Sequence, residues 1–264
     1  MILMTQALTR RFGELTAVDA LTISVARGEV FGLLGPNGAG KSTVIKMLTT
    51  LLPPTSGTAH IAGFEITRDA SKVRRVIGYV PQMLSVDPSL TGYENLLIFA
   101  KLYDIPRAER DLRVRDALIL VGLTDAASKL VRQYSGGMIR RLEIAQSTLH
   151  RPPLLFLDEP TVGLDPLARK AVWDHIARLR ADFGTTIFLT THYMEEAESL
   201  CTRVAIMHRG KTVIDDTPER LKASTGKSEA TLGDVFLHYA GDTLESGGGF
   251  SETSRGRRAA KRLG

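Results

Sequence analysis

The chain has 264 residues, of which 43% are apolar and 24% are charged. This composition is typical of a globular protein with a buried core and gives no reason to expect disorder in most of the chain. The single cysteine, Cys201, excludes an internal disulfide and a thiolate metal site, as is usual in a reducing compartment. No apolar stretch approaches the roughly 20 residues of a membrane-spanning helix, and the N-terminus lacks a signal-peptide pattern. We therefore expect a cytoplasmic chain.

The net charge of +5 is concentrated at the C-terminal end. Residues 250–264 contain five lysines or arginines against one acidic residue, Glu252, so the rest of the chain is close to neutral. A nucleic-acid-binding protein usually presents a basic face over its fold, and nucleic acid is therefore an unexpected partner. Residues 241–264 are rich in Gly and Ser and lack periodicity, which predicts a disordered tail. Contact of this tail with a membrane surface or RNA is the less favoured alternative.

The first third of the chain shows strand patterns followed by a helix. Residues 21–25 alternate apolar and polar side chains, as in a half-buried strand. Val30 to Leu34 is an apolar run that leads into glycine-rich sequence, which predicts a buried strand feeding a loop. Lys41 to Leu52 has helical periodicity, and Pro53 and Pro54 are expected to stop that helix.

The middle of the chain changes from strand to helix character. Ile61 to Ala62 and Val76 to Val80 are strand candidates. Thr91 and Glu94 have the spacing of a capping box, which predicts a helix starting near residue 92. Residues 83–150 are therefore interpreted as a mostly helical insertion.

Strand character then returns in two near-continuous apolar runs, Leu154 to Leu157 and Thr186 to Leu189, with a predicted helix over Leu167 to Arg180 between them. Such runs are typical of a parallel sheet that is covered on both faces, and the β-α-β order predicts an α/β core. Val204 to Met207 and Thr212 to Ile214 add two short strands.

The most specific motif follows the predicted strand at residues 30–34 and matches the G-x-x-x-x-G-K-[ST] phosphate loop. Its glycines allow backbone N–H groups to turn toward a phosphate, Lys41 supplies a positive charge, and Ser42 offers a hydroxyl to Mg²⁺. A chance glycine-rich turn is the alternative, but the flanking strand and helix argue against it. The candidate phosphate-binding residues are Gly35, Pro36, Asn37, Gly38, Ala39, Gly40, Lys41, Ser42 and Thr43.

Two carboxylates, Asp158 and Glu159, follow the apolar run at residues 154–157. Asp158 is predicted to hold the Mg²⁺ shell, and Glu159 to act as the base on the attacking water. Surface acids at an ordinary strand end are the alternative, which a phosphate loop upstream makes less favourable.

A third motif, Ser135-Gly136-Gly137, opens a predicted helix. Ser135 is a suitable N-cap, and two glycines leave backbone N–H groups accessible to an anion. A simple capped helix start explains the same residues equally well. Because the chain already has one phosphate loop, the phosphate-binding alternative suggests that this turn completes the pocket of a neighbouring copy.

These motifs occur in a fixed order: GPNGAGKST, Gln82, SGGM, FLDEPT, the GLDP that ends at Pro166, and His192. Over about residues 1–240 the chain resembles the nucleotide-binding domain of an ATP-binding cassette (ABC) protein. The resemblance implies an α/β P-loop NTPase fold with a RecA-like core, an antiparallel β subdomain and an inserted α-helical subdomain. It also implies a head-to-tail homodimer that encloses two ATP molecules.

The resemblance assigns roles to further residues. Phe12 would stack on adenine, where the family more often has tyrosine. Gln82 would contact Mg²⁺ and the attacking water and sense the membrane partner. Asp165 would link the two sites of a dimer, and His192 would contact the γ-phosphate. Lys41, Gln82, Glu159 and His192 are thus the expected catalytic residues, and Ser42, Gln82 and Asp158 the expected Mg²⁺ ligands.

The signature departs from the common LSGGQ by having Tyr134 first and Met138 last, while its Ser-Gly-Gly core is intact. This form, with Arg140 and Arg141 after it, is similar to the daunorubicin-type drug-resistance exporter branch. That branch pairs with a separate integral-membrane permease. We therefore expect an ATPase that powers multidrug-type export from the inner face of the cell membrane. An import ATPase, a soluble cassette ATPase acting on ribosome or DNA, and a module without turnover are the alternatives.

Overall fold

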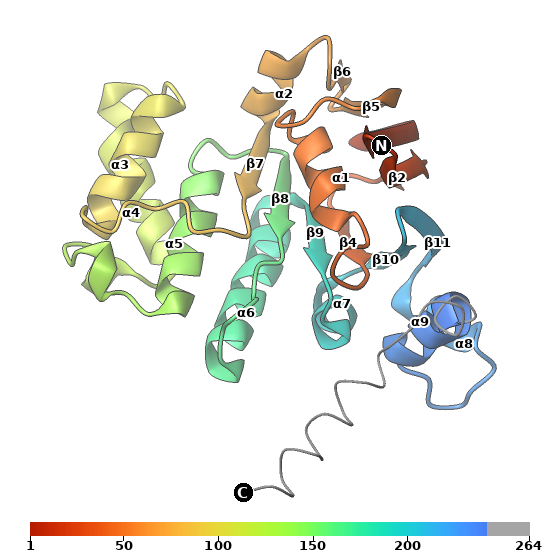
Figure 1. The fold of residues 1–264 in the computed structure, drawn as a ribbon. Coiled ribbons are helices and arrows are strands. Elements are labelled where there is room, and N and C mark those ends of the chain that lie inside the picture. Colours follow the sequence, from red (N-terminus) through yellow and green to blue (C-terminus); the bar gives the residue numbers. More distant parts are fainter. Residues whose placement is uncertain (242–264) are drawn as a thin grey trace, which may run out of the picture.

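The structure is a computed structural model and describes residues 1–241. The predicted disordered tail, apart from Gly241, lies outside the described residues. The described part of the chain forms two β-sheets, with a separate group of helices beside one of them (Figure 1). No helix within residues 1–241 is both long and apolar enough to cross a membrane.

The larger sheet has six strands in the order β11-β10-β4-β9-β8-β7, and all neighbours are parallel except β10 and β11. Its strands are β4 (Val30–Leu34), β7 (Ile77–Val80), β8 (Leu154–Asp158), β9 (Thr186–Thr191), β10 (Arg203–His208) and β11 (Lys211–Asp216). Every residue of β4, β8 and β9 is buried, as their apolar runs predict for central strands with both faces covered.

The smaller sheet is antiparallel, with the order β2-β1-β5-β6 and β3 paired to β1. Its strands are β1 (Leu3–Phe12), β2 (Leu15–Leu21), β3 (Ser24–Val25), β5 (Ser56–Ile61) and β6 (Phe64–Glu65). The predicted strand over residues 21–25 is split between β2 and β3, although the predicted burial of Leu21, Ile23 and Val25 is correct.

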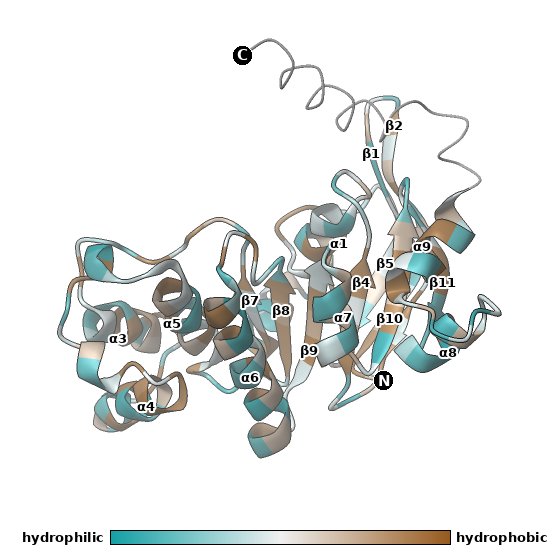
Figure 2. Ribbon diagram, turned by 90° about the horizontal axis from the view of Figure 1, so that it is seen from below, coloured by the Kyte–Doolittle hydropathy of each residue, from teal (hydrophilic) through white to brown (hydrophobic). Residues whose placement is uncertain are grey.

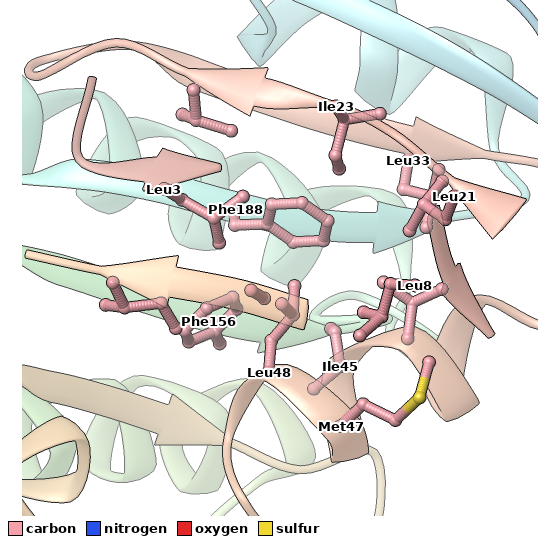
Figure 3. Packing of buried hydrophobic residues seen from close by; sticks show 14 of the residues in the cluster. Leu3, Leu8, Leu21, Ile23, Leu33, Ile45, Met47, Leu48, Phe156 and Phe188 are labelled. Carbon is pink, nitrogen blue, oxygen red and sulfur yellow. The ribbon is translucent and has the colours of Figure 1, made fainter. Parts of the chain in front are cut away.

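Buried side chains form a layer on each face of the parallel sheet, and the first of these layers lies between the two sheets. Alternate residues of a strand point to opposite faces, and one face of the parallel sheet meets helix α1 (Lys41–Leu48), α2 (Ala70–Val76) and the antiparallel sheet. Figure 3 shows Phe156 and Phe188 from the parallel sheet beside Leu3 and Leu8 from β1 and Leu48 from α1. This layer fixes α1 directly after the loop that follows β4.

The second layer covers the opposite face of the parallel sheet. There Val30, Leu157 and Leu189 pack against α6 (Pro166–Phe183) and α7 (Met194–Leu200), with α8 (Pro218–Ala223) and α9 (Leu232–Ala240) at one side. In Figure 2 the central strands are brown, whereas α6 and α7 carry teal residues, as expected for helices with one apolar face and one polar face toward solvent.

The inserted helical group is α3 (Gly92–Leu102), α4 (Arg107–Leu120) and α5 (Gly136–Thr148), with two short 3₁₀ helices, Thr124–Ala126 and Val131–Gln133. It has its own buried cluster, built on residues such as Leu96, Leu118 and Leu142. The capping box at Thr91 is present and starts α3 at residue 92, as predicted. The predicted helical insertion over residues 83–150 matches this group.

Helix α1 ends at Leu48 rather than at the predicted Leu52. Thr50 has a left-handed φ of 64°, and the N–H groups of Leu51 and Leu52 both turn back to the carbonyl of Lys46. These hydrogen bonds end the helix before Pro53 and Pro54, so the two prolines do not terminate it.

Candidate functional site

The glycine-rich loop lies at the carboxyl end of β4, where it turns into α1. Gly35 donates its N–H to the carbonyl of Thr191 on β9 at 3.2 Å, which fixes the start of the loop. Gly40 has a φ of 108°, and a Cβ there would lie 2.3 Å from the carbonyl oxygen of Ala17. No side chain caps α1, which begins at Lys41. The N–H groups of its first turn are therefore available to an anion, as a phosphate site requires.

The ammonium group of Lys41 lies inside this loop. Its Nζ donates to the carbonyls of Gly35 at 2.8 Å and Pro36 at 3.1 Å, and lies 3.1 Å from Oε1 of Glu159. Lys41 is only 4% exposed. A buried cation is costly unless it is paired and hydrogen-bonded, and these three contacts supply that pairing. The loop thus holds a positive charge where outer phosphates are expected to bind.

Asp158 ends β8 and faces the loop. It is 2% exposed, and its Oδ1 accepts hydrogen bonds from Ser42 Oγ at 3.1 Å and Thr190 Oγ1 at 2.6 Å. Carboxylate and hydroxyl oxygens are the donors that Mg²⁺ accepts, and it usually takes few from a protein. The oxygens of Ser42 and Asp158 are hydrogen-bonded to each other and are of the hard type that Mg²⁺ prefers. These two predicted ligands therefore fit Mg²⁺.

Glu159 follows Asp158 but makes separate contacts. Its N–H donates to both oxygens of Thr190, each at 3.1 Å, and its φ is 50°, in the left-handed region. Oε1 contacts Lys41, while Oε2 lies 3.1 Å from Nδ1 of His192. The structure therefore brings three predicted catalytic residues into one connected group.

Phe12, Gln82 and Asp165 lie outside that group. Phe12 ends β1, is 45% exposed, and has the guanidinium of Arg10 4.6 Å from its ring centre. Gln82 is exposed after β7, and its backbone carbonyl accepts from Arg140 at 3.2 Å. Asp165 caps α6 by accepting from two N–H groups of its first turn, at 3.0 and 2.9 Å. The partial exposure of Phe12 is compatible with stacking on a base, beside or in place of Arg10.

The Ser-Gly-Gly turn (Ser135, Gly136 and Gly137) opens α5 in the helical group. Ser135 is the N-cap and accepts from the N–H of Met138 at 3.3 Å. A Cβ at Gly137 would lie 2.8 Å from Cβ of Ala168, so that this glycine also permits the close approach of α5 and α6. In the sheet, β9, β8 and β7 lie between the loop strand β4 and this group (Figure 1). The structure does not bring the turn to the loop of its own chain.

Sequence reasoning missed Thr190, which is fully buried and contacts both Asp158 and Glu159. Its signal was a polar residue near the carboxyl end of an apolar strand, next to the strand that carries the carboxylates. Such a hydroxyl needs partners when it is buried, and the parallel register places Thr190 opposite Asp158.

Comparisons with known proteins agree with this geometry. Residues 18–162, more than half of the chain, match the family model described as "ABC transporter". The chain is 46% identical over 242 residues to the daunorubicin/doxorubicin resistance ATP-binding protein DrrA of Streptomyces peucetius, covering 92% of this chain and 72% of that protein. It is 39% identical to the linearmycin resistance ATP-binding protein LnrL of Bacillus subtilis, covering 85% and 72% of the two chains.

Solved structures show the same fold. An ATP-binding subunit of an ABC transporter has a TM-score of 0.80 and 30% identity, with coverage of 91% of this chain and all of the other. The ATP-binding cassette MJ0796, solved as a dimer with ADP and phosphate, has a TM-score of 0.72 and 27% identity, with coverage of 81% and 98%. The predicted P-loop NTPase fold is thus confirmed, and the chain belongs to the ABC transporter family.

Proposed function

We propose that this chain is the ATP-hydrolysing subunit of an ABC exporter of the drug-resistance type, and that it powers a separate integral-membrane permease. The arrangement of Glu159 between Lys41 and His192, beside the Ser42–Asp158 pair, carries the proposal. In this proposal a cation, a base, an orienting imidazole and a pair of metal ligands act together at one loop. That is the set of groups that phosphoryl transfer to water requires.

Each residue of the site has a defined task in this proposal. Lys41 and the N–H groups of the first turn of α1 bind the outer phosphates. Glu159 accepts a proton from the attacking water, and His192 holds the Glu159 carboxylate and the γ-phosphate in line. Mg²⁺ held by Ser42 and Asp158 would neutralise phosphate charge. Most of the rate enhancement then comes from positioning and electrostatics.

The remaining predicted residues complete the site in the same scheme. Phe12 stacks on the adenine, and Gln82 reports the state of the γ-phosphate to the permease. The Ser-Gly-Gly turn and Asp165 serve the nucleotide of a second copy, because within one chain the turn lies beyond β7. The active form is therefore a head-to-tail homodimer on the inner face of the cell membrane, held there by the permease.

The relatives support the direction of transport. The names of DrrA and LnrL refer to resistance against daunorubicin or doxorubicin and against linearmycin, which favours export over import. A ribosome- or DNA-directed cassette remains the competing function. Purification of the tagged chain from membranes separates the two, because we expect a multi-span protein to accompany it. Recovery of ribosomes instead would contradict the proposal.

The hydrolytic role is tested with Glu159→Gln, which keeps the shape of the side chain but removes the base. We expect ATP binding to persist, hydrolysis to fall by a factor of about 10² to 10⁴, and an ATP-bound dimer to accumulate in size-exclusion chromatography with light scattering. Glu109→Gln, on the surface of α4, is the control and should behave as the parent. Hydrolysis by Glu159→Gln at the parental rate would show that another group is the base.

A further inference from the structure

Helix α5 contains a buried ion pair, Arg140 and Glu143, one turn after the Ser-Gly-Gly turn. Nη1 of Arg140 lies 3.0 Å from Oε2 of Glu143, and the two residues are 5% and 0% exposed. Burial raises the pKa of Glu143, and the charge of Arg140 acts against that rise. Neither residue belongs to the site described above, and both come from the helix that carries the turn.

The pair also binds the segment that contains Gln82, here residues 81–85. Arg140 donates from Nη1 to the carbonyl of Pro81 at 2.7 Å and from Nη2 to the carbonyl of Gln82 at 3.2 Å. Oε1 of Glu143 accepts from the N–H of Ser85 at 2.6 Å and from its hydroxyl at 3.0 Å. Both ends of the segment are therefore held by α5.

The segment has no other regular structure to hold its shape. It follows β7, and its central side chains are exposed, with Met83 82% and Leu84 65% exposed. Its backbone position therefore depends on α5, while its exposed central side chains can meet a ligand or a partner. A buried ion pair is weak support for stability, because an apolar pair of similar volume often serves as well. The hydrogen bonds to residues 81–85 are what an apolar pair would not supply.

We propose that Arg140 and Glu143 are positioning residues that make residues 81–85 and the Ser-Gly-Gly turn move as one body. The approach of Gln82 to the nucleotide of its own chain is then coupled to the presentation of Ser135 and Gly137 to the nucleotide of the second copy. The inference rests on the proposed function, since it assumes that both elements contact ATP. It assigns to one ion pair the coupling of the two ATP sites of a dimer.

The test is the double variant Arg140→Met/Glu143→Leu, which preserves an apolar, well-filled α5 but removes the four hydrogen bonds to residues 81–85. We expect kcat for ATP to fall about 10- to 100-fold, as for a misplaced positioning group, with KM changed less than about 2-fold because the phosphate loop is intact. The Hill coefficient for ATP should fall from near 2 to near 1, because coupled sites set its upper value.

A second readout does not depend on hydrolysis. In the parent, Mg²⁺ and ATP should slow amide hydrogen exchange in residues 35–43, 81–85 and 134–138 over the same range of ATP concentration. In the double variant, residues 35–43 should keep this protection, while residues 134–138 should no longer follow residues 81–85. Parallel protection of both segments in the variant would overturn the proposal, whether or not the parent hydrolyses ATP.

The matched control is Arg203→Met/Asp215→Leu, which removes another arginine–carboxylate pair, between β10 and β11. We expect it to lower the melting temperature but to leave KM, kcat and the Hill coefficient unchanged. Glu143→Gln, whose amide oxygen still accepts from the N–H of Ser85, should retain part of the coupling. A merely structural role is indicated if the α5 double variant lowers the melting temperature as the control does and keeps the parental Hill coefficient. Absence of hydrolysis in the parent itself would instead refute the proposed function.

Discussion

Thr190 offers a direct test of how Asp158, the proposed Mg²⁺ ligand, is held in place. Its hydroxyl donates to Asp158 at 2.6 Å and accepts from the N–H of Glu159 at 3.1 Å, within a fully buried strand. Thr190→Val keeps the branched shape but removes both bonds. Thr191→Val is the matched control, since that equally buried hydroxyl accepts one bond, from the N–H of Tyr193 at 2.9 Å.

The two substitutions should lower the free energy of unfolding by different amounts, because only Thr190→Val removes a hydrogen bond to a charged group. Hydrogen bonds to ionised groups contribute about 1.5–3 kcal/mol and neutral ones about 0.5–1.5 kcal/mol. We therefore expect Thr190→Val to lower the free energy of unfolding by about 2–3 kcal/mol and Thr191→Val by about 1 kcal/mol. Asp158 is only 2% exposed, so that solvent water does not readily replace the lost donor.

Urea unfolding gives the stabilities, and titration of ATPase activity with Mg²⁺ at saturating ATP gives the apparent metal affinity. Loss of a partner that orients a metal ligand costs about 10- to 100-fold in affinity, so the half-saturating Mg²⁺ concentration should rise at least about 10-fold in Thr190→Val. It should stay at the parental value in Thr191→Val. Equal Mg²⁺ requirements in the two variants would refute the idea that Thr190 orients Asp158.

Two further predictions concern stability. Gly137→Ala should lower the free energy of unfolding in urea by about 1–3 kcal/mol, because its Cβ would meet Ala168 at 2.8 Å. Gly136→Ala should lower it much less, since its Cβ would meet only the end of the Leu164 side chain at 3.3 Å. Equal losses in the two variants would contradict tight packing of α5 against α6. Burial and nearby Arg178 lower the pKa of His175 from 6.5 to about 4, so the unfolded chain binds the proton first and stability is lost as the pH falls from about 6.5 to about 4. His175→Leu should abolish up to about 3 kcal/mol of that loss, and an unchanged pH profile would refute it.

The parallel strands could be predicted because their sequences lack polar side chains on both faces of the strand. Val30 to Leu34 and Leu154 to Leu157 are apolar without interruption, and only a strand covered on both faces accepts such a run at that length. The phosphate loop, Asp158 and Glu159 followed directly, since they sit where these strands end. The helical insertion was predictable from the capping box at Thr91.

Other features depend on contacts between distant parts of the chain. Helices α2, α7, α8 and α9 are six to nine residues long, too short to show a clear period, and tertiary packing stabilises them. The close approach of α5 and α6, which requires a glycine at residue 137, is visible only once α6 packs against α5. Thr190 becomes important only once β9 is paired with β8, and Arg140 only once α5 meets the end of β7.

The left-handed backbone of Glu159 has a consequence for how this site can change over generations. A residue other than glycine, asparagine or aspartate in that region costs about 1–2 kcal/mol. The same residue, however, pairs with the buried ammonium of Lys41 at 3.1 Å. Replacement by Gly or Asn would relieve this strain but would leave Lys41 without its carboxylate, and loss of one partner of a buried ion pair costs about 3–5 kcal/mol. The site therefore cannot be relaxed one residue at a time, because only a joint exchange of Lys41 and Glu159 would remove both the strained backbone and the buried charge.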